Sequence, residues 1–206
     1  MLPDMTIIKR LPKRNQGMDQ QEFFTVHHKL TANVEPLDNG FILPNQNEFI
    51  SEVPAPFIVA SEFSQLDSLT ESAMNELKNS DFKHVVQLLD HQNGKLNLLL
   101  TFMLAQQDKE EFRCFTTSFG ASQFSYKSNT TLATASLVRV KLFLDHPPAA
   151  IYCYAKVVEC KELEQGYEIT LTYQRLRDID QDLLIKAALY QQQKLLRQRS
   201  IDRQNK

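Results

Sequence analysis

The 206-residue chain has few of the residues that common catalytic loops require: it contains only five glycines. No Gly-x-Gly-x-x-Gly or other glycine-rich phosphate loop is present, which excludes the nucleotide-binding sites built on such loops. The pattern Gly-x-Ser-x-Gly, which sets a nucleophilic serine on a sharp turn, is also absent. We therefore expect no catalytic residues and a protein that is not an enzyme. An enzyme with an unrecognised site is kept as an alternative.

Cysteine and histidine are too few and too scattered to indicate a metal site. The cysteines are odd in number, lack ligand spacing and fall within predicted strands, which predicts that they line the core or a pocket wall. His84 and His91 can share one helix face, but no acidic or cysteine partner accompanies them at ligand spacing. We expect no metal and no cofactor. Unpaired thiols also fit a reducing cytoplasm. The cysteines are Cys114, Cys153 and Cys160.

Neither charge nor hydrophobicity is concentrated in one part of the chain. The formal net charge is −2, which argues against broad affinity for nucleic-acid polymers or membranes. The longest apolar run, residues 96–105, contains Asn97 and is too short to span a bilayer. The N-terminus shows no apolar segment of the signal-peptide type. We expect a cytoplasmic protein without membrane insertion.

Apolar and polar residues alternate in several short segments between residues 112 and 173. Alternation of this kind, bounded by turns, predicts half-buried antiparallel strands. Because closing a sheet removes its exposed edges, we expect these strands to form a small β-barrel. The predicted strands are Phe112–Phe119, Gln123–Lys127, Val138–Leu144, Ile151–Val157 and Tyr167–Tyr173.

The region before the barrel has a mixed pattern. Residues 23–34 alternate as a strand, and residues 57–60 are a candidate for one more short strand. Short apolar pieces lie between them, at residues 41–43 and 49–50. These pieces have two possible arrangements: a small N-terminal sheet, or a set of strands that clasps the barrel.

Two helices with a 3.6-residue apolar period follow. The first is expected to be capped by Ser61 or Ser64, and the second runs from about Phe82 to Gln107. The two predict an antiparallel hairpin. Because the second helix is longer than the barrel it leads into, part of its apolar face needs another partner.

The fold class predicted is α+β, with a C-terminal antiparallel barrel and helix behind an N-terminal region of short strands and a helical hairpin. The proposed division is a basic N-terminal segment (1–21), an α/β region (22–108), and the barrel with its helix (109–206). The C-terminal helix begins around Asp178, where early acidic residues suit the helix dipole. Its first turns are expected to cover the barrel. Its distal part, with Leu195 and Leu196, has two interpretations: pairing with another helix in a homo-oligomer, or a frayed, solvated tail.

Residues 110–190 resemble the PilZ family, small β-barrels that typically receive the bacterial second messenger cyclic di-GMP. The family motif Asp/Asn-x-Ser-x-x-Gly aligns with Thr116, Ser118 and Ala121, while Gly120 stands one residue before the final position. The order of the later strands, and Gly166 before the last strand, also match. The resemblance implies a signalling role in motility, surface attachment or biofilm control, and action through protein partners.

The departures from the family pattern concern the ligand site. In the family, the serine motif contacts a guanine and an upstream Arg-x-x-x-Arg segment wraps the phosphates. Here residues 83–109 contain no arginine, and Thr116 replaces the acidic or amide residue. We therefore expect weak or lost nucleotide binding. The alternative is a true cyclic di-GMP receptor in which Arg10 and Arg14 hold the phosphates, with Ser118 and Gly120 on the guanine side. A similar spacing at Arg199 and Arg203 is interpreted as a basic tail.

Overall fold

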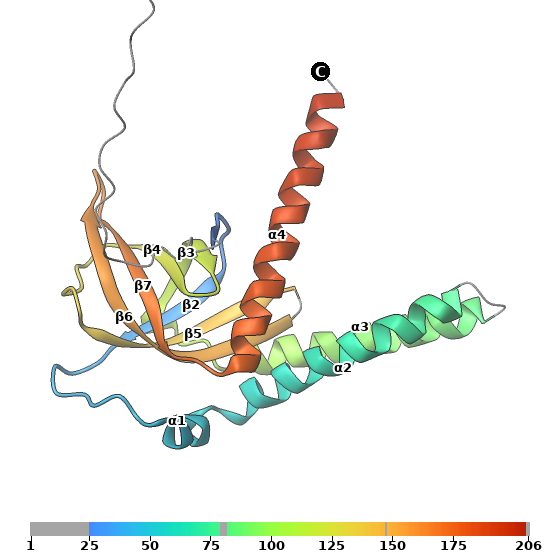
Figure 1. Cartoon of the computed structure of the whole chain (residues 1–206), viewed down its shortest axis with the longest axis horizontal. Coiled ribbons are helices and arrows are strands. Elements are labelled where there is room, and N and C mark those ends of the chain that lie inside the picture. Colours follow the sequence, from blue (N-terminus) through green and yellow to red (C-terminus); the bar gives the residue numbers. More distant parts are fainter. Residues whose placement is uncertain (1–24, 79–81, 147, 205–206) are drawn as a thin grey trace, which may run out of the picture.

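The protein is a closed antiparallel barrel with a helical hairpin on one side and a long C-terminal helix (Figure 1). The computed structural model describes residues 25–78, 82–146 and 148–204. The sheet order is β1-β3-β2-β5-β6-β7-β4, and pairing of β3 with β4 closes a ring of six strands. The strands are β1 (Thr25–Val26), β2 (Thr31–Pro36), β3 (Arg113–Gly120), β4 (Gln123–Ser128), β5 (Leu137–Asp145), β6 (Pro148–Glu162) and β7 (Tyr167–Arg175). The predicted α+β class and barrel are therefore confirmed.

The barrel core follows the alternation seen in the sequence. In β5, the four apolar residues of one parity are all buried, and the residues between them are only partly covered. All three cysteines lie in strands, as predicted, and are unpaired. Each barrel strand thus offers one apolar face to the interior. The β5 residues are Val138, Val140, Leu142 and Leu144.

Strand β2 inserts into the barrel between β3 and β5. The prediction of one continuous strand over residues 23–34 is wrong: β1 and β2 are separated by residues 27–30, and residues 23–24 lie outside the described range. The interruption has a tertiary cause, because the Thr116 hydroxyl bonds to the Leu30 N–H and the His28 carbonyl, which a strand ladder would otherwise use. Of the two arrangements considered, these strands join the barrel and do not form a separate sheet.

Helix formation begins earlier than predicted. Residues 49–50 lie in α1 (Gln46–Glu52), where the Asn45 side chain caps the helix and Glu48 completes a capping box. The prediction of a strand at residues 57–60 is wrong, because these residues belong to helix α2 (Ala55–Lys78). Its start follows Pro54, since proline is well tolerated at a helix N-terminus.

Ser61 and Ser64 do not cap α2, contrary to the prediction. Both residues lie past the first turn of α2, and both side chains are buried. The Ser61 hydroxyl donates a hydrogen bond to the Phe57 carbonyl one turn earlier. A serine that bonds back to its own helix in this way is not available as a cap.

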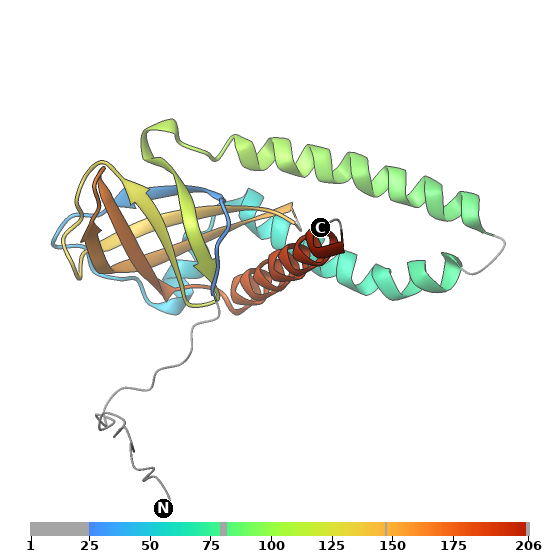
Figure 2. The same ribbon diagram turned by 90° about the horizontal axis from the view of Figure 1, so that it is seen from above.

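The predicted hairpin is confirmed, with α3 (Lys83–Ala105) running antiparallel to α2 and both projecting from the barrel (Figure 2). Between the base of the hairpin and the outer face of β6 lies a second apolar cluster. Because the hairpin covers this face, β6 is buried on both sides from residue 149 to residue 155. The cluster contains Phe49, Val53, Phe57, Ala60, Leu100, Leu104, Ala150, Tyr152 and Tyr154.

Helix α4 (Asp178–Gln204) starts where the sequence predicted. Its first turns pack on the barrel through Leu184 and Ala188, and both side chains are fully buried. Arg177, just before the helix, donates to both oxygens of buried Asp180 at 2.7 Å and to the Ser61 hydroxyl at 3.0 Å. This contact ties the start of α4 to α2.

Candidate functional site

The Ser-containing motif lies in the second half of β3 and the turn into β4. A bulge interrupts the β3–β4 ladder between Thr116 and Ser118. A bulge shifts the inward–outward alternation by one residue. As a result Thr116 and Phe119, three positions apart, are both buried.

The Thr116 side chain is buried and bonds to the segment between β1 and β2. The side chain is only 3% exposed. The hydroxyl accepts a hydrogen bond from the Leu30 backbone N–H at 2.9 Å and donates to the His28 carbonyl at 2.8 Å. Both roles of the hydroxyl are therefore used inside the protein.

Ser118 lies on the outer face of the barrel. Its neighbour Phe119 points into the core, and successive strand residues face opposite sides. Ser118 stands opposite Ser125 on β4, which stands opposite Thr170 on β7, and the Ser125 and Thr170 hydroxyl oxygens are 3.0 Å apart. We name these three residues the hydroxyl row.

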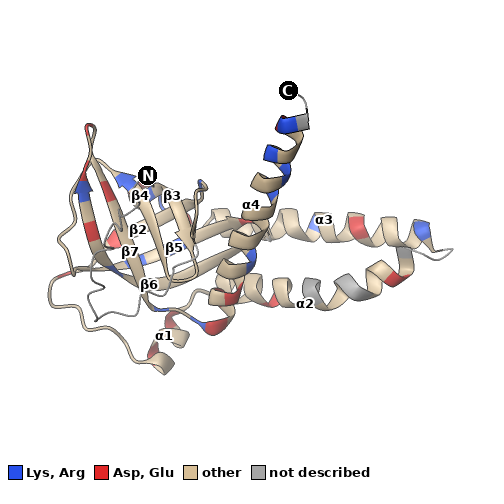
Figure 3. Ribbon diagram, turned by 45° about the horizontal axis from the view of Figure 1, so that its top comes forward, with Lys and Arg blue, Asp and Glu red and all other residues tan. Residues whose placement is uncertain are grey.

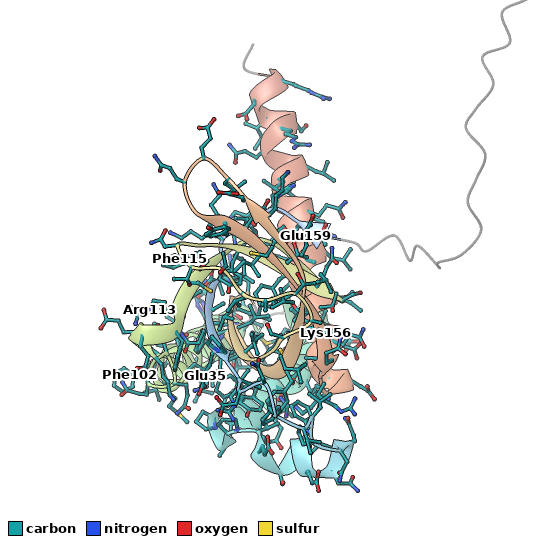
Figure 4. All side chains as sticks on the ribbon, turned by 90° about the vertical axis from the view of Figure 1, so that its left-hand side faces the viewer. Glu35, Phe102, Arg113, Phe115, Lys156 and Glu159 are labelled. Carbon is teal, nitrogen blue, oxygen red and sulfur yellow. The ribbon has the colours of Figure 1, made fainter. Side chains whose placement is uncertain are left out.

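Charged side chains border the hydroxyl row. Thr117 donates to the Glu168 carboxylate at 3.1 Å, and Glu159 stands opposite Thr170 on β6. Glu159 and Lys156 lie on the side of the barrel away from Arg113 and Phe115 (Figure 4). Lys127 on β4 and Lys161 on β6 both stand opposite Glu168, so the border of the hydroxyl row carries charges of both signs.

Gly120 and Ala121 lie at the end of β3. Gly120 is buried and pairs with Thr25 of β1, and Ala121 is in the bend that follows. The Tyr173 backbone N–H donates to the Ser122 carbonyl at 3.1 Å and holds this bend against β7. The N-terminal segment therefore joins the barrel directly beside the motif.

Arg10 and Arg14 lie outside the described residues. Four arginines of the described barrel region are engaged with protein groups. Arg113 contacts Asp108 at 2.7 Å, and Arg139 contacts Glu35 at 3.2 Å. Arg175 donates a hydrogen bond to the Pro44 carbonyl, and Arg177 donates to the Asp180 carboxylate. The described part of the chain therefore does not test whether Arg10 and Arg14 meet the Ser-containing motif.

A cavity of about 730 Å³ opens near the start of β3 and the end of β4. It includes Thr116 and Thr117 but not Ser118, Gly120 or Ala121. The Lys29 ammonium lies 3.9 Å from the centre of the Phe115 ring in its wall. Burial raises the pKa of the Cys114 thiol, also in its wall, to about 12, which keeps the thiol neutral and unreactive.

Two features of this region were not foreseen from the sequence. One is the hydroxyl row, which the alternation of β4 and β7 could have indicated, since Ser125 and Thr170 fall on outward positions. The other is buried Asn33 of β2, which donates to Asp108 at 2.7 Å and accepts from the Lys109 N–H at 2.8 Å. Asparagine in a strand gives no sequence signal for such a junction.

Among the described residues, no three His, Cys, Asp or Glu side chains gather as a metal-ligand set. A search of the described helices also finds none that is both long and apolar enough to cross a bilayer.

Comparison with protein-family models gave no match, and no curated protein matches the sequence. Among solved structures, the chain is similar to a tetrameric PilZ domain from Xanthomonas campestris that self-assembles through a helical bundle. The TM-score is 0.54 at 15% identity, covering 85% of this chain and 91% of that chain. MotI/DgrA, an inhibitor of motility from Bacillus subtilis, gives a TM-score of 0.46 at 10% identity, covering 89% of this chain and 57% of that one. The fold is that of a PilZ domain, and this assignment rests on the first structure.

Proposed function

We propose that this chain is a non-enzymatic, cytoplasmic regulatory module of the PilZ type that binds cyclic di-GMP weakly or not at all and acts through protein partners. The observation that carries the proposal is the position of Thr116. The residue in the acidic or amide place of the motif is buried, and its hydroxyl is bonded to His28 and Leu30. Its only proton is already donated, and its 3% exposure leaves little of the side chain accessible to the edge of a guanine.

The phosphate side supports the same proposal. Cyclic di-GMP carries two phosphates, which guanidinium groups bind bidentately. The four arginines of the described barrel region bond instead to protein groups. A dianionic ligand on the hydroxyl row would therefore have to bind without these guanidinium groups.

One observation favours the second candidate, a cyclic di-GMP receptor that uses Arg10 and Arg14. Strand β1 begins at Thr25 and pairs with Gly120, so the N-terminal segment leaves the barrel beside Ser118. Arg14 precedes Thr25 by about ten residues, and an extended chain covers up to ~3.5 Å per residue. The two arginines are therefore within chain reach of the hydroxyl row.

Titration calorimetry with cyclic di-GMP separates the two candidates. The proposal predicts no measurable heat, or weak binding that is unchanged in an Arg10→Ala, Arg14→Ala variant. Micromolar or tighter binding that this variant abolishes would overturn the proposal and establish the receptor. The matched control is Arg199→Ala with Arg203→Ala, which removes the same charge and the same spacing from the exposed end of α4.

We also propose assembly into a homo-oligomer, with the distal half of α4 as one candidate interface. Leu195 and Leu196 on this half are 43% and 56% exposed. The tetrameric Xanthomonas domain supports self-assembly for this fold. Light scattering on the full chain and on a chain that ends at Gln193 tests it, because the shorter chain keeps the α4 residues packed on the barrel. Equal masses for the two would exclude α4 as the interface.

A further inference from the structure

Helix α3 carries an apolar stripe that the rest of the described chain does not cover. Its positions are spaced 4, 3, 4, 3 and 4 residues apart, which is the a/d spacing of a heptad repeat. The five apolar members are between 41% and 62% exposed. We name the stripe the α3 seam. Its members are Val85, Leu89, Gln92, Leu96, Leu99 and Met103.

The face of α3 that holds the helix in place lies beside the α3 seam. Val86, Leu100 and Leu104 are 3–4% exposed, and the last two belong to the cluster between the hairpin and β6. At 3.6 residues per turn, the α3 seam is centred roughly a quarter turn from these three positions, so it lies beside the packed face and not within it. A single exposed leucine is ordinary, but five in one continuous stripe indicate an interaction site.

The few charges on α3 help to decide which kind of partner covers the α3 seam. The helix has only three, Lys83, Asp90 and Lys95, and it is almost free of charge over the half nearer the barrel (Figure 3). A helix that lies on an anionic membrane has a strongly basic polar face, which α3 lacks. A partner with a matching apolar stripe fits better.

We propose that the α3 seam pairs with the α3 seam of a second copy of this chain. A 3.5-residue repeat is satisfied by a helix with the same repeat, because only that partner keeps the stripe in contact along its length. The second copy supplies such a helix by definition. The seam spans fewer than three heptads, which is short for free peptides, but α3 is already held helical by its contacts with α2 and β6. The hairpin projects beyond the barrel, so a second hairpin can approach it (Figures 1 and 2).

Gln92 gives the proposal a signature of its own. It is the one polar member of the α3 seam and it is exposed. A polar residue at a core position of a coiled coil lowers the stability of association while fixing its register. Replacing it by leucine should therefore strengthen assembly, an effect that damage to the fold does not imitate.

The experiment is sedimentation equilibrium of the full chain and three variants. The wild-type chain should self-associate reversibly. Leu96→Lys with Leu99→Lys, which sets charges in the interface, should weaken association at least about tenfold, and Gln92→Leu should tighten it about as much. The matched control is Leu66→Lys with Leu69→Lys on α2, which makes the same change at exposed leucines outside the α3 seam and should leave the dissociation constant unchanged. Circular dichroism verifies that each variant is folded.

Three outcomes would overturn the proposal. The first is a wild-type chain that stays monomeric at the highest concentration it reaches in solution. The second is an α3 variant that associates as tightly as the wild type. The third is a Gln92→Leu chain that associates no more tightly than the wild type. Nucleotide binding enters none of these measurements, so the proposal stands or falls independently of the cyclic di-GMP titration.

Discussion

The hydroxyl of Thr116 lies 2.9 Å from the backbone nitrogen of Leu30, a residue 86 positions earlier in the chain. A second bond in the opposite direction runs from the Thr116 backbone N–H to the Leu30 carbonyl at 3.0 Å. Together they fasten the short segment between β1 and β2 to the middle of β3. A position that suggests ligand chemistry in the sequence is thus a structural joint.

Thr116→Val should destabilise the folded protein by about 1–3 kcal/mol, because it leaves the buried Leu30 N–H without an acceptor at nearly constant side-chain volume. Urea denaturation followed by circular dichroism measures the change. Ser118→Ala is the control, since Ser118 lies on the outer face of the same strand and its loss should change stability by less than about 0.5 kcal/mol. Equal effects of the two substitutions would contradict the structural role of Thr116.

Thr116→Asp should not create cyclic di-GMP binding, although it restores the acidic residue of the family motif. A carboxylate at this buried position would face the His28 carbonyl, which cannot donate a hydrogen bond to it. We expect a less stable protein and no heat of binding in calorimetry. A gain of binding would show that the side chain at residue 116 reaches the ligand surface.

Stability should fall as the pH is lowered through about 6.5, and His28 should contribute to this fall. Burial lowers the pKa of His28 below its ordinary value of 6.5, against a smaller opposing effect of Asp145. The folded state then binds fewer protons than the unfolded state below that pH, so acid favours unfolding. Melting temperatures between pH 5 and pH 8 should depend less on pH in His28→Gln. His84→Gln, at an exposed position of α3, is the control and should keep the wild-type dependence.

Asn33→Ala should destabilise the protein by about 1–3 kcal/mol, because it removes both polar roles of a side chain that is 3% exposed and leaves the Lys109 N–H without this acceptor. The same loss should loosen the point where the chain returns from α3 to the barrel. Hydrogen exchange at residues 106–113 measures this directly. Asn39→Ala, in the exposed turn before α1, should change neither stability nor exchange there.

A fragment of residues 109–206 should fail to fold, because it lacks β2. Without β2, β3 and β5 each lose their shared neighbour and the ring opens at two edges. Circular dichroism and gel filtration of this fragment, compared with a chain of residues 25–206, provide the test. Cooperative melting of the shorter fragment at the same temperature as the longer chain would contradict it.

The parts of the fold that the sequence predicted are those with a regular apolar period. Alternation in β5 and β7 and the 3.6-residue period of α3 determine those elements, because packing agrees there with local pattern. Residues 57–60 were misassigned because four apolar residues fit a strand and a buried helix equally well. Thr116 was misjudged because nothing local shows that a hydroxyl will meet a backbone 86 residues away. The α3 seam was foreseen only as an apolar face in need of a partner.

The position of β2 also determines the order in which the protein can be completed. Glu35 on β2 and Arg139 on β5 are 104 residues apart, and the whole helical hairpin is made between them. At synthesis rates of about 5–20 residues per second, β2 waits several seconds on the ribosome before its second neighbour exists. Helix α3 is complete before this interval ends, so the α3 seam is available to a neighbouring nascent chain before either barrel has closed.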